Sequence, residues 1–198
     1  EEKRPGEYFP VLEDQRGAYI MNSQDLCLIE ELPALTALGI ASFKIEGRMK
    51  GIHYVATTTR AYRQVRDACL AGQNVAEKIA SAKEELKRTR HRPYTTGFLW
   101  GEPEQNPARS YEKLPYNFVG VALGEGSKVQ VEVRNHLAYG QRVEILRPNL
   151  PTFQQPGRMF AEDGSMVEAA HANQIVVMEF VQPVEKYSLI RLAEEEGQ

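Results

Sequence analysis

The feature that most constrains the fold is a change in hydrophobic period near Arg92. Before it, short apolar runs alternate with stretches in which apolar residues recur every three or four positions, which is the spacing of an amphipathic helix. After it, apolar and polar residues alternate one by one, which is the spacing of half-buried strands. We therefore expect two domains, residues 1–92 and residues 93–198, of different fold class.

The first part reads as strands alternating with helices. The expected elements, in chain order, are a strand at 19–21, a helix through Leu26 and Ile29 that restarts at Pro33 and ends at Gly39, a strand at 40–45, a helix from Ile52 to Gly72, and a polar helix over 75–87. This order favours a parallel sheet with helical crossovers. Two strands cannot form such a sheet alone, so we interpret this part as the C-terminal remnant of a TIM-like (β/α) barrel whose other strands precede Glu1.

The second part has the pattern of a small antiparallel β-barrel. Val129, Val131 and Val133 alternate with polar residues, and Gly124 and Gly126 precede this run as a turn. Asp163-Gly164 is typical of a hairpin turn. Five to seven short strands are expected in the roughly 100 residues after Arg92.

Composition narrows the class of protein. No apolar run approaches the ~20 residues that a membrane span needs. The two cysteines, Cys27 and Cys69, provide no disulfide framework and favour a reducing, cytoplasmic compartment. The sequence starts without Met and without an apolar signal region, so we expect a portion of a longer chain.

Charge is distributed unevenly along the chain. Residues 1–92 carry 15 Lys/Arg and 13 Asp/Glu, a net charge of +2. Residues 93–198 carry 9 Lys/Arg and 14 Asp/Glu, a net charge of −5. Residues 44–66 include six Lys or Arg residues and a single acidic residue, Glu46. Such a segment suits an anionic small molecule or a phosphate backbone, although a solvated helix face produces the same composition.

The candidate site lies where the expected strand at 40–45 ends. Ligands of parallel α/β proteins collect at the carboxyl ends of strands. There, Arg48 can bind a carboxylate or phosphate with two parallel hydrogen bonds, and Lys44 and Lys50 add positive charge. Glu46 is the candidate base, or else it orients Arg48. The structural alternative is an ion pair between Glu46 and Arg48 that only caps the strand.

Two further residues have possible chemical roles. Cys27 is expected in the first turn of a helix, where the helix dipole lowers the pKa of a thiol and favours a thiolate ligand or nucleophile; a buried inert thiol is the alternative. His53 is the one histidine close to the candidate site and could hydrogen-bond a ligand or simply lie on the surface. No Ser/His/Asp set, zinc-protease helix or glycine-rich phosphate loop is present.

Several stretches resemble a known family. "NSQDLC", "FKIEGRMK" and "YVATTTRAYRQ" together resemble the collagenase-like peptidase family, peptidase family U32. "RPYTTGF" and the strands that follow resemble the C-terminal domain of one branch, the bacterial tRNA hydroxylation proteins. The resemblance covers nearly the whole chain, but only the latter half of a family member.

The resemblance implies both a fold and an activity. The family's main domain is a TIM-like barrel, and the branch is similar to enzymes that install 5-hydroxyuridine at the tRNA wobble position with prephenate as a required metabolite. Some relatives hold an iron–sulfur cluster through four cysteines, and Cys27 matches one of these. One thiolate cannot hold a cluster, so we expect no cofactor in this chain by itself. Because prephenate is a dicarboxylate, Lys44, Arg48, Lys50 and His53 are its candidate binding residues, with Glu46 and Arg48 as candidate catalytic residues.

Two other functions remain open from the sequence. A collagenase-like protease would need a nucleophile, a metal pair or an acid dyad that this chain does not supply. The second alternative is a non-enzymatic module that binds a protein or RNA, since small β-barrels are often binding modules. A truncated parallel sheet would also expose an edge through which the chain could self-associate.

Overall fold

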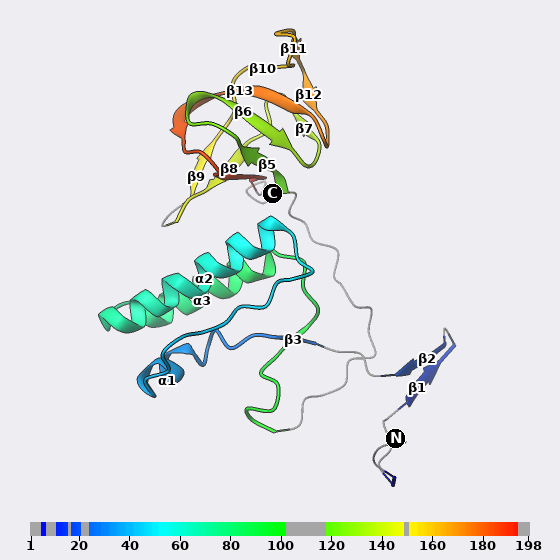
Figure 1. Ribbon diagram of the computed structural model, residues 1–198, viewed down its shortest axis with the longest axis vertical. Helices are drawn as coiled ribbons and strands as arrows, with labels where there is room; N and C mark the ends of the chain where they lie inside the picture. Colours follow the sequence, from blue (N-terminus) through cyan, green and yellow to red (C-terminus); the bar gives the residue numbers. More distant parts are fainter. Residues whose placement is uncertain are drawn as a thin grey trace, which may run out of the picture. The chain divides into compact units, whose positions relative to one another are not determined.

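The computed structural model of the chain describes residues 5–6, 11–15, 17–20, 24–101, 118–148 and 151–193. The chain divides into two compact units (Figure 1). The first, here called the helical unit, comprises residues 1–48 and 57–113. The second, the sheet unit, comprises residues 49–56 and 114–198. The division therefore passes through the first turns of one helix.

The described residues of the helical unit form three helices and two short sheets. Its elements are β1 (Val11–Asp14), β2 (Gly17–Ile20), β3 (Asp25–Leu26), α1 (Leu32–Ala37), α2 (Ile52–Ala71, whose first residues belong to the sheet unit), α3 (Val75–Lys87) and β4 (Tyr94–Thr95). β1 and β2 form an antiparallel hairpin, while β3 and β4 pair in parallel with Asp25 opposite Tyr94. The parallel pair joins residues almost 70 positions apart in the chain.

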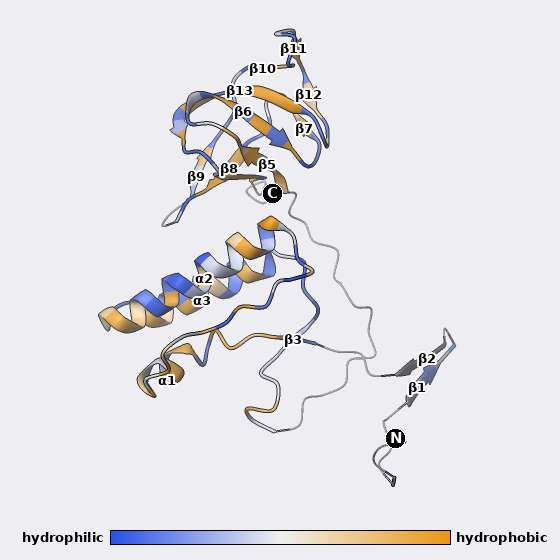
Figure 2. Ribbon diagram, viewed as in Figure 1, coloured by the Kyte–Doolittle hydropathy of each residue, from blue (hydrophilic) through white to orange (hydrophobic). Residues whose placement is uncertain are grey.

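The two long helices were predicted from their spacing, and the structure confirms them. Ala61 and Val65 of α2 pack with Ala82 and Leu86 of α3 in one hydrophobic cluster, together with Ile29 and Leu32. Figure 2 shows hydrophobic and hydrophilic residues alternating around both helices, as expected for helices with one buried face. Arg60 also reaches Glu85 at 3.2 Å, which links the two helices through a mostly buried ion pair.

Glycines end two of the helices as expected. Gly39 follows α1 with a φ of +73°, and Gly72 follows α2 with a φ of +66°. A residue with a Cβ is disfavoured in this left-handed conformation, which leaves glycine as the natural residue just past a helix end. α1 is shorter than predicted, and Pro33 lies in its first turn.

Two expectations for this part of the chain were wrong, whereas the strand expected at 19–21 is confirmed over its described residues. Residues 40–45, predicted as a strand, have no regular structure and are exposed. A strand needs a hydrogen-bonded neighbour, and none of the described segments pairs with this one. The helix expected through Leu26 and Ile29 is replaced by β3 and a turn, so Asp25 and Cys27 do not lie in a first helical turn. The strand expected at 19–21 is the end of β2, and Met21 lies outside the described residues.

The sheet unit is built around an eight-stranded antiparallel sheet that curls into a half-barrel (Figure 1). Its strands, in spatial order, are β11 (Met166–Val167), β10 (Met159–Phe160), β13 (Ile175–Val184), β6 (Gly126–Val133), β5 (Phe118–Ala122), β14 (Leu189–Leu192), β8 (Val143–Leu146) and β9 (Thr152–Gln154). A separate pair consists of β7 (Leu137–Ala138) and β12 (Ala169–Ala170). The expected antiparallel all-β part is confirmed in this form, but a remnant of a TIM-like barrel is not.

The predicted alternation in β6 is confirmed. Val129, Val131 and Val133 are at most 1% exposed and belong to the main hydrophobic cluster of the unit. Gly126 and Gly164 take φ angles of +113° and +82° at the two predicted turns. The period of two therefore translates directly into one buried and one solvated face.

A side-chain bridge joins two strands of the curled sheet that do not pair by a backbone ladder. Gln154, on the edge strand β9, is 7% exposed. Its Oε1 accepts a hydrogen bond from the backbone N–H of Gln182 at 3.0 Å, and its Nε2 donates to the Gln182 carbonyl at 3.4 Å. The Gln154 side-chain amide thus bonds the Gln182 N–H and C=O groups, as the backbone of a neighbouring strand would.

A buried ion pair lies in the same sheet. Arg191 on β14 and Glu144 on β8 are direct cross-strand neighbours. The Arg191 guanidinium donates from Nε to Glu144 Oε2 at 2.6 Å and from Nη2 to Oε1 at 2.9 Å. The two side chains are 0% and 3% exposed. The two-pronged geometry satisfies charges that would otherwise be costly to bury.

None of the described helices is long and apolar enough to cross a membrane.

Candidate functional site

The predicted cationic site divides between the two units. Lys44, Glu46 and Arg48 belong to the helical unit, and Lys50 and His53 belong to the sheet unit. In the helical unit, the structure brings Glu46 and Arg48 together. The backbone N–H of Arg48 donates to Glu46 Oε1 at 2.9 Å, and both residues are exposed. This contact stabilises a local turn and leaves the Arg48 guanidinium at the surface.

Lys50 and His53 each contact an aromatic ring. The Lys50 ammonium lies 4.8 Å from the centre of the Tyr54 ring, a favourable cation–π distance. The half-buried imidazole of His53 stacks on Phe118, with ring centres 5.3 Å apart and planes 13° from parallel. These contacts hold both side chains in place. The strand on which the site prediction rested is absent, so the roles of the five residues stay predictions.

Cys27 lies in a different setting from the one expected. It follows β3 in an irregular segment, and its backbone N–H donates to the Thr95 carbonyl at 2.9 Å. α1 begins only at Leu32. Cys27 is therefore not at a helix N-terminus, and the expected helix dipole does not act on it.

The thiol of Cys27 has a specific hydrogen-bond donor. The Tyr62 hydroxyl donates to Cys27 Sγ at 3.5 Å and accepts a hydrogen bond from the Leu28 backbone N–H at 2.9 Å. Burial raises the pKa of Tyr62 well above its usual value, and its hydrogen bond to Cys27 adds to this effect. Tyr62 therefore stays a neutral donor at physiological pH and connects α2 to the segment after β3.

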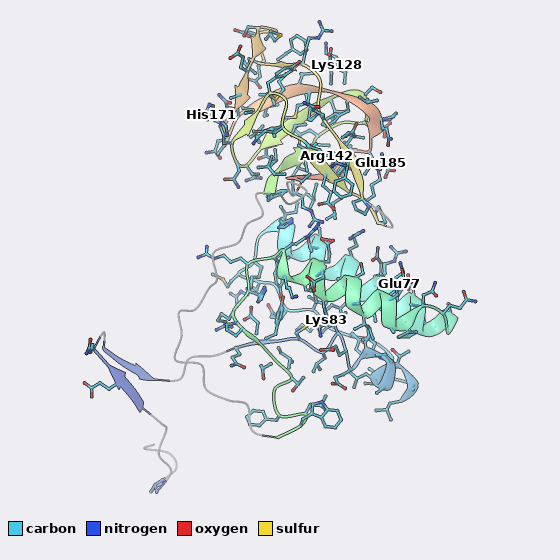
Figure 3. All side chains as sticks on the ribbon, turned by 180° about the vertical axis from the view of Figure 1, so that it is seen from behind. Glu77, Lys83, Lys128, Arg142, His171 and Glu185 are labelled. Atoms are coloured by element: carbon cyan, nitrogen blue, oxygen red, sulfur yellow. The ribbon has the colours of Figure 1, made fainter. Side chains whose placement is uncertain are left out.

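A small cavity opens beside Cys27. Its volume is about 190 Å³, and its lining residues are Cys27, Ile29, Glu30, Lys83, Leu86, Lys87, Tyr94, Thr95 and Thr96. The cations at this cavity are paired, because Lys83 meets Glu30 at 2.9 Å and Lys87 meets Glu84 at 2.7 Å. Figure 3 labels Lys83 in the helical unit. The cavity is smaller than a typical drug-sized pocket and would admit only a compact ligand.

An ion pair missed by the sequence analysis fixes this region. Asp25 accepts hydrogen bonds from Arg92, at 2.8 Å from Nε to Oδ1 and at 3.2 Å from the backbone N–H to Oδ2. The backbone N–H of Asp25 donates in turn to the Pro93 carbonyl at 3.0 Å. These bonds align β3 with β4 and so position Cys27. The two partners are 67 residues apart, and no local pattern in the sequence links them.

The resemblance implies an iron–sulfur cluster, which the described residues do not fit by themselves. A cluster needs several thiolate ligands. Among the residues that the structure describes, no three His, Cys, Asp or Glu side chains gather as a metal site. Cys27 and Cys69 are both free, and the Cys27 sulfur accepts its hydrogen bond from a tyrosine. A role of Cys27 as one ligand of a cluster therefore stays a prediction.

Comparison with known proteins gives the same family for both parts of the chain. The profile of peptidase family U32 matches residues 1–109, and that of the peptidase family U32 C-terminal domain matches residues 115–191. The solved C-terminal domain of a U32 peptidase from Geobacillus thermoleovorans is 30% identical, covering 39% of this chain and 92% of that domain, with a TM-score of 0.37.

Curated relatives are similar over most of the chain. The tRNA hydroxylation protein P of Escherichia coli is 37% identical over 158 residues, which are 75% of this chain and 33% of the relative. The tRNA hydroxylation protein P1 of Bacillus subtilis is 36% identical over 171 residues, which are 82% of this chain and 40% of the relative. The chain thus spans between a third and two-fifths of these relatives, and its match to the two profiles shows that it belongs to peptidase family U32.

Proposed function

We propose that this chain is the C-terminal part of a protein that hydroxylates tRNA. The observation that carries this proposal is the 37% identity over 158 residues to the tRNA hydroxylation protein P of Escherichia coli. The likeness extends over both units rather than over one short motif, since it covers 75% of the chain. The reaction we infer is 5-hydroxylation of the wobble uridine, with prephenate as the required metabolite.

In this proposal, the exposed cations before and at the start of α2 bind the acidic metabolite. Lys44 and Arg48 are solvent-accessible, and a planar guanidinium is well suited to grip a carboxylate through two hydrogen bonds. Lys50 adds a third positive charge, and His53 adds a hydrogen-bonding group. Glu46, which already bonds the Arg48 backbone, orients that residue or acts as a base.

Two further parts of the proposal concern the whole protein. The parallel pairing of β3 with β4 supports a (β/α) barrel, because such barrels are built from parallel strands. Cys27 would supply one ligand to an iron–sulfur cluster whose other ligands lie outside the described residues. The cluster would supply redox chemistry, while the residues of this chain would bind and orient the acidic metabolite.

The test is nucleoside mass spectrometry of tRNA from cells that lack the whole gene. Loss of 5-hydroxyuridine-derived nucleosides, restored by the intact gene, is the expected result. Unchanged nucleosides in the deletion strain would overturn the proposal.

The family's description as a peptidase favours proteolysis as the second candidate. A cysteine nucleophile would need a base, and no hydrogen bond links Cys27 to a histidine among the described residues. Cleavage of gelatin by the purified whole protein, abolished by Cys27→Ala, would establish this alternative. If a well-folded preparation of the whole protein does not cleave gelatin, proteolysis is excluded as the second candidate.

A further inference from the structure

We propose that His136 and His171 form a two-histidine site for a divalent transition-metal ion on the surface of the sheet unit. The proposal rests on how the strands place the two rings. β7 and β12 pair antiparallel, with Leu137 opposite Ala170. Continuing that register by one residue puts His136 opposite His171. Both side chains are exposed, and Figure 3 labels His171 on the outside of the curled sheet.

The separation of the rings suits one shared ion. The ring centres of His136 and His171 are 5.1 Å apart, and the planes are tilted by 54°. Two imidazoles bound to one tetrahedral ion, with metal–nitrogen bonds of about 2.1 Å, have ring centres about 5 Å apart. The distance between the ring centres therefore already matches that of two imidazoles sharing one ion.

The backbone beneath the two histidines is firmly held. Leu137 and Ala170, the adjacent cross-strand pair, are both 0% exposed. On the other side, the Gln174 side chain accepts a hydrogen bond from the His171 backbone N–H at 2.7 Å. Asn173 closes this turn in the left-handed conformation, with a φ of +70°. A scaffold fixed at both strands reduces the ordering cost of binding.

The donor set defines the class of ion. Neutral imidazole nitrogens suit Zn²⁺, Cu²⁺ and Ni²⁺, whereas Mg²⁺ and Ca²⁺ prefer oxygen. No third His, Cys, Asp or Glu gathers with the pair among the described residues. The ion would keep open coordination positions for water or for a donor from another molecule, so we expect rapid exchange. This site is independent of the proposed tRNA chemistry.

The experiment is a Zn²⁺ titration of the full chain near pH 7.5, followed by calorimetry and by imidazole nitrogen resonances in NMR spectra. Both thiols are replaced (Cys27→Ser and Cys69→Ser) so that they do not compete for zinc. We expect one equivalent of Zn²⁺ to bind, with the two ring signals moving at the same midpoint. His136→Ala and His171→Ala should each weaken binding at least tenfold, whereas His91→Gln, at a histidine of the helical unit that stacks on Tyr94, should not.

Two results would overturn the proposal. One is the absence of any shift at the two rings with Zn²⁺ and Ni²⁺. The other is zinc binding that either single alanine variant leaves unchanged. Because the NMR titration uses native histidines, it decides the question even if a histidine variant fails to fold.

Discussion

The helical unit and the sheet unit differ in how many strands pair into one sheet. In the sheet unit, eight strands form one continuous antiparallel ladder within residues 118–192, and Gln154 bridges two strands that the ladder leaves apart. In the helical unit, β3 and β4 pair over only two residues each. Both units pair segments that are distant in sequence, since Leu189 of β14 lies opposite Val121 of β5 and Asp25 of β3 lies opposite Tyr94 of β4. The difference is that the sheet unit joins its strands into one large ladder, whereas β3 and β4 pair only with each other among the described strands.

The same contrast applies to charged residues. The sheet unit buries its central ion pair, Arg191 with Glu144. The helical unit keeps Lys44, Glu46 and Arg48 at the surface. A buried pair contributes to a fold and is inaccessible to ligands, whereas exposed cations contribute little to stability and remain available for binding.

The largest expected effect comes from breaking the buried pair. Arg191→Ala leaves the Glu144 carboxylate buried without its partner and should destabilise the sheet unit by about 3–5 kcal/mol. Urea denaturation followed by circular dichroism measures this loss. The matched control is Arg134→Ala, which removes an exposed pair with Glu132 and should cost less than about 1 kcal/mol. Equal effects of the two substitutions would contradict the structural role of burial.

A smaller loss is expected where β3 meets β4. Asp25→Ala removes the carboxylate that Arg92 holds, and a hydrogen bond to a charged group contributes about 1.5–3 kcal/mol. The more specific result is local: the Cys27 amide, which donates to the Thr95 carbonyl, should exchange with deuterium faster. Unchanged exchange at Cys27 would show that the parallel pair does not depend on the ion pair. Glu84→Ala, at an exposed pair with Lys87, is the control.

The side-chain bridge in the curled sheet should contribute about as much as two ordinary hydrogen bonds. Gln154→Leu keeps the buried volume but leaves the Gln182 backbone groups without that amide, at a cost of about 1–3 kcal/mol. Thermal unfolding measures the change. Gln155→Leu is the control, because the Gln155 amide only donates to the Gly140 carbonyl at the surface. If Gln154→Leu were as stable as the native chain, the bridge would not hold the two strands.

The smallest effect is a surface titration. Hydrogen bonds from the Ser165 hydroxyl and backbone N–H hold the pKa of Asp163 below its usual value. A carboxyl with a lowered folded-state pKa favours the folded state above its unfolded pKa, and this contribution is lost as pH falls through the folded pKa. Ser165→Ala should raise the pKa of Asp163 in an NMR titration. Asp163→Asn should remove the effect of acid on the hairpin at the pH values where Asp163 is protonated. An unchanged Asp163 titration in Ser165→Ala would show that the Ser165 hydroxyl does not lower the pKa of Asp163.

Local patterns were sufficient to predict much of the fold. The helix over 75–87 matches α3, the long helix begins at Ile52 as expected, and the alternating valines of β6 are buried. These features follow from side-chain period and turn residues within a few positions of one another.

Contacts between distant residues could not be predicted in the same way. Asp25 bonds Arg92 across 67 positions, and Arg191 bonds Glu144 across 47. The strand predicted at 40–45 failed for a related reason, because an apolar run becomes a strand only beside a partner strand. The wrong strand also removed the positional basis for placing Glu46 and Arg48 at a strand end. The site at residues 44–53 therefore rests on the charges and exposure of its side chains and stays a prediction.

The most direct test of the proposed site combines the rescue assay with two arginine variants. The whole protein carrying Arg48→Ala is compared with one carrying Arg63→Ala, which removes an exposed arginine of α2 that pairs with Asp67. We predict that Arg63→Ala restores 5-hydroxyuridine-derived nucleosides to the level of the intact gene. Arg48→Ala should restore less than about a tenth of that level, because the proposed function gives Arg48 two charge-assisted hydrogen bonds to the acidic metabolite. Full restoration by Arg48→Ala would contradict a functional site at residues 44–53.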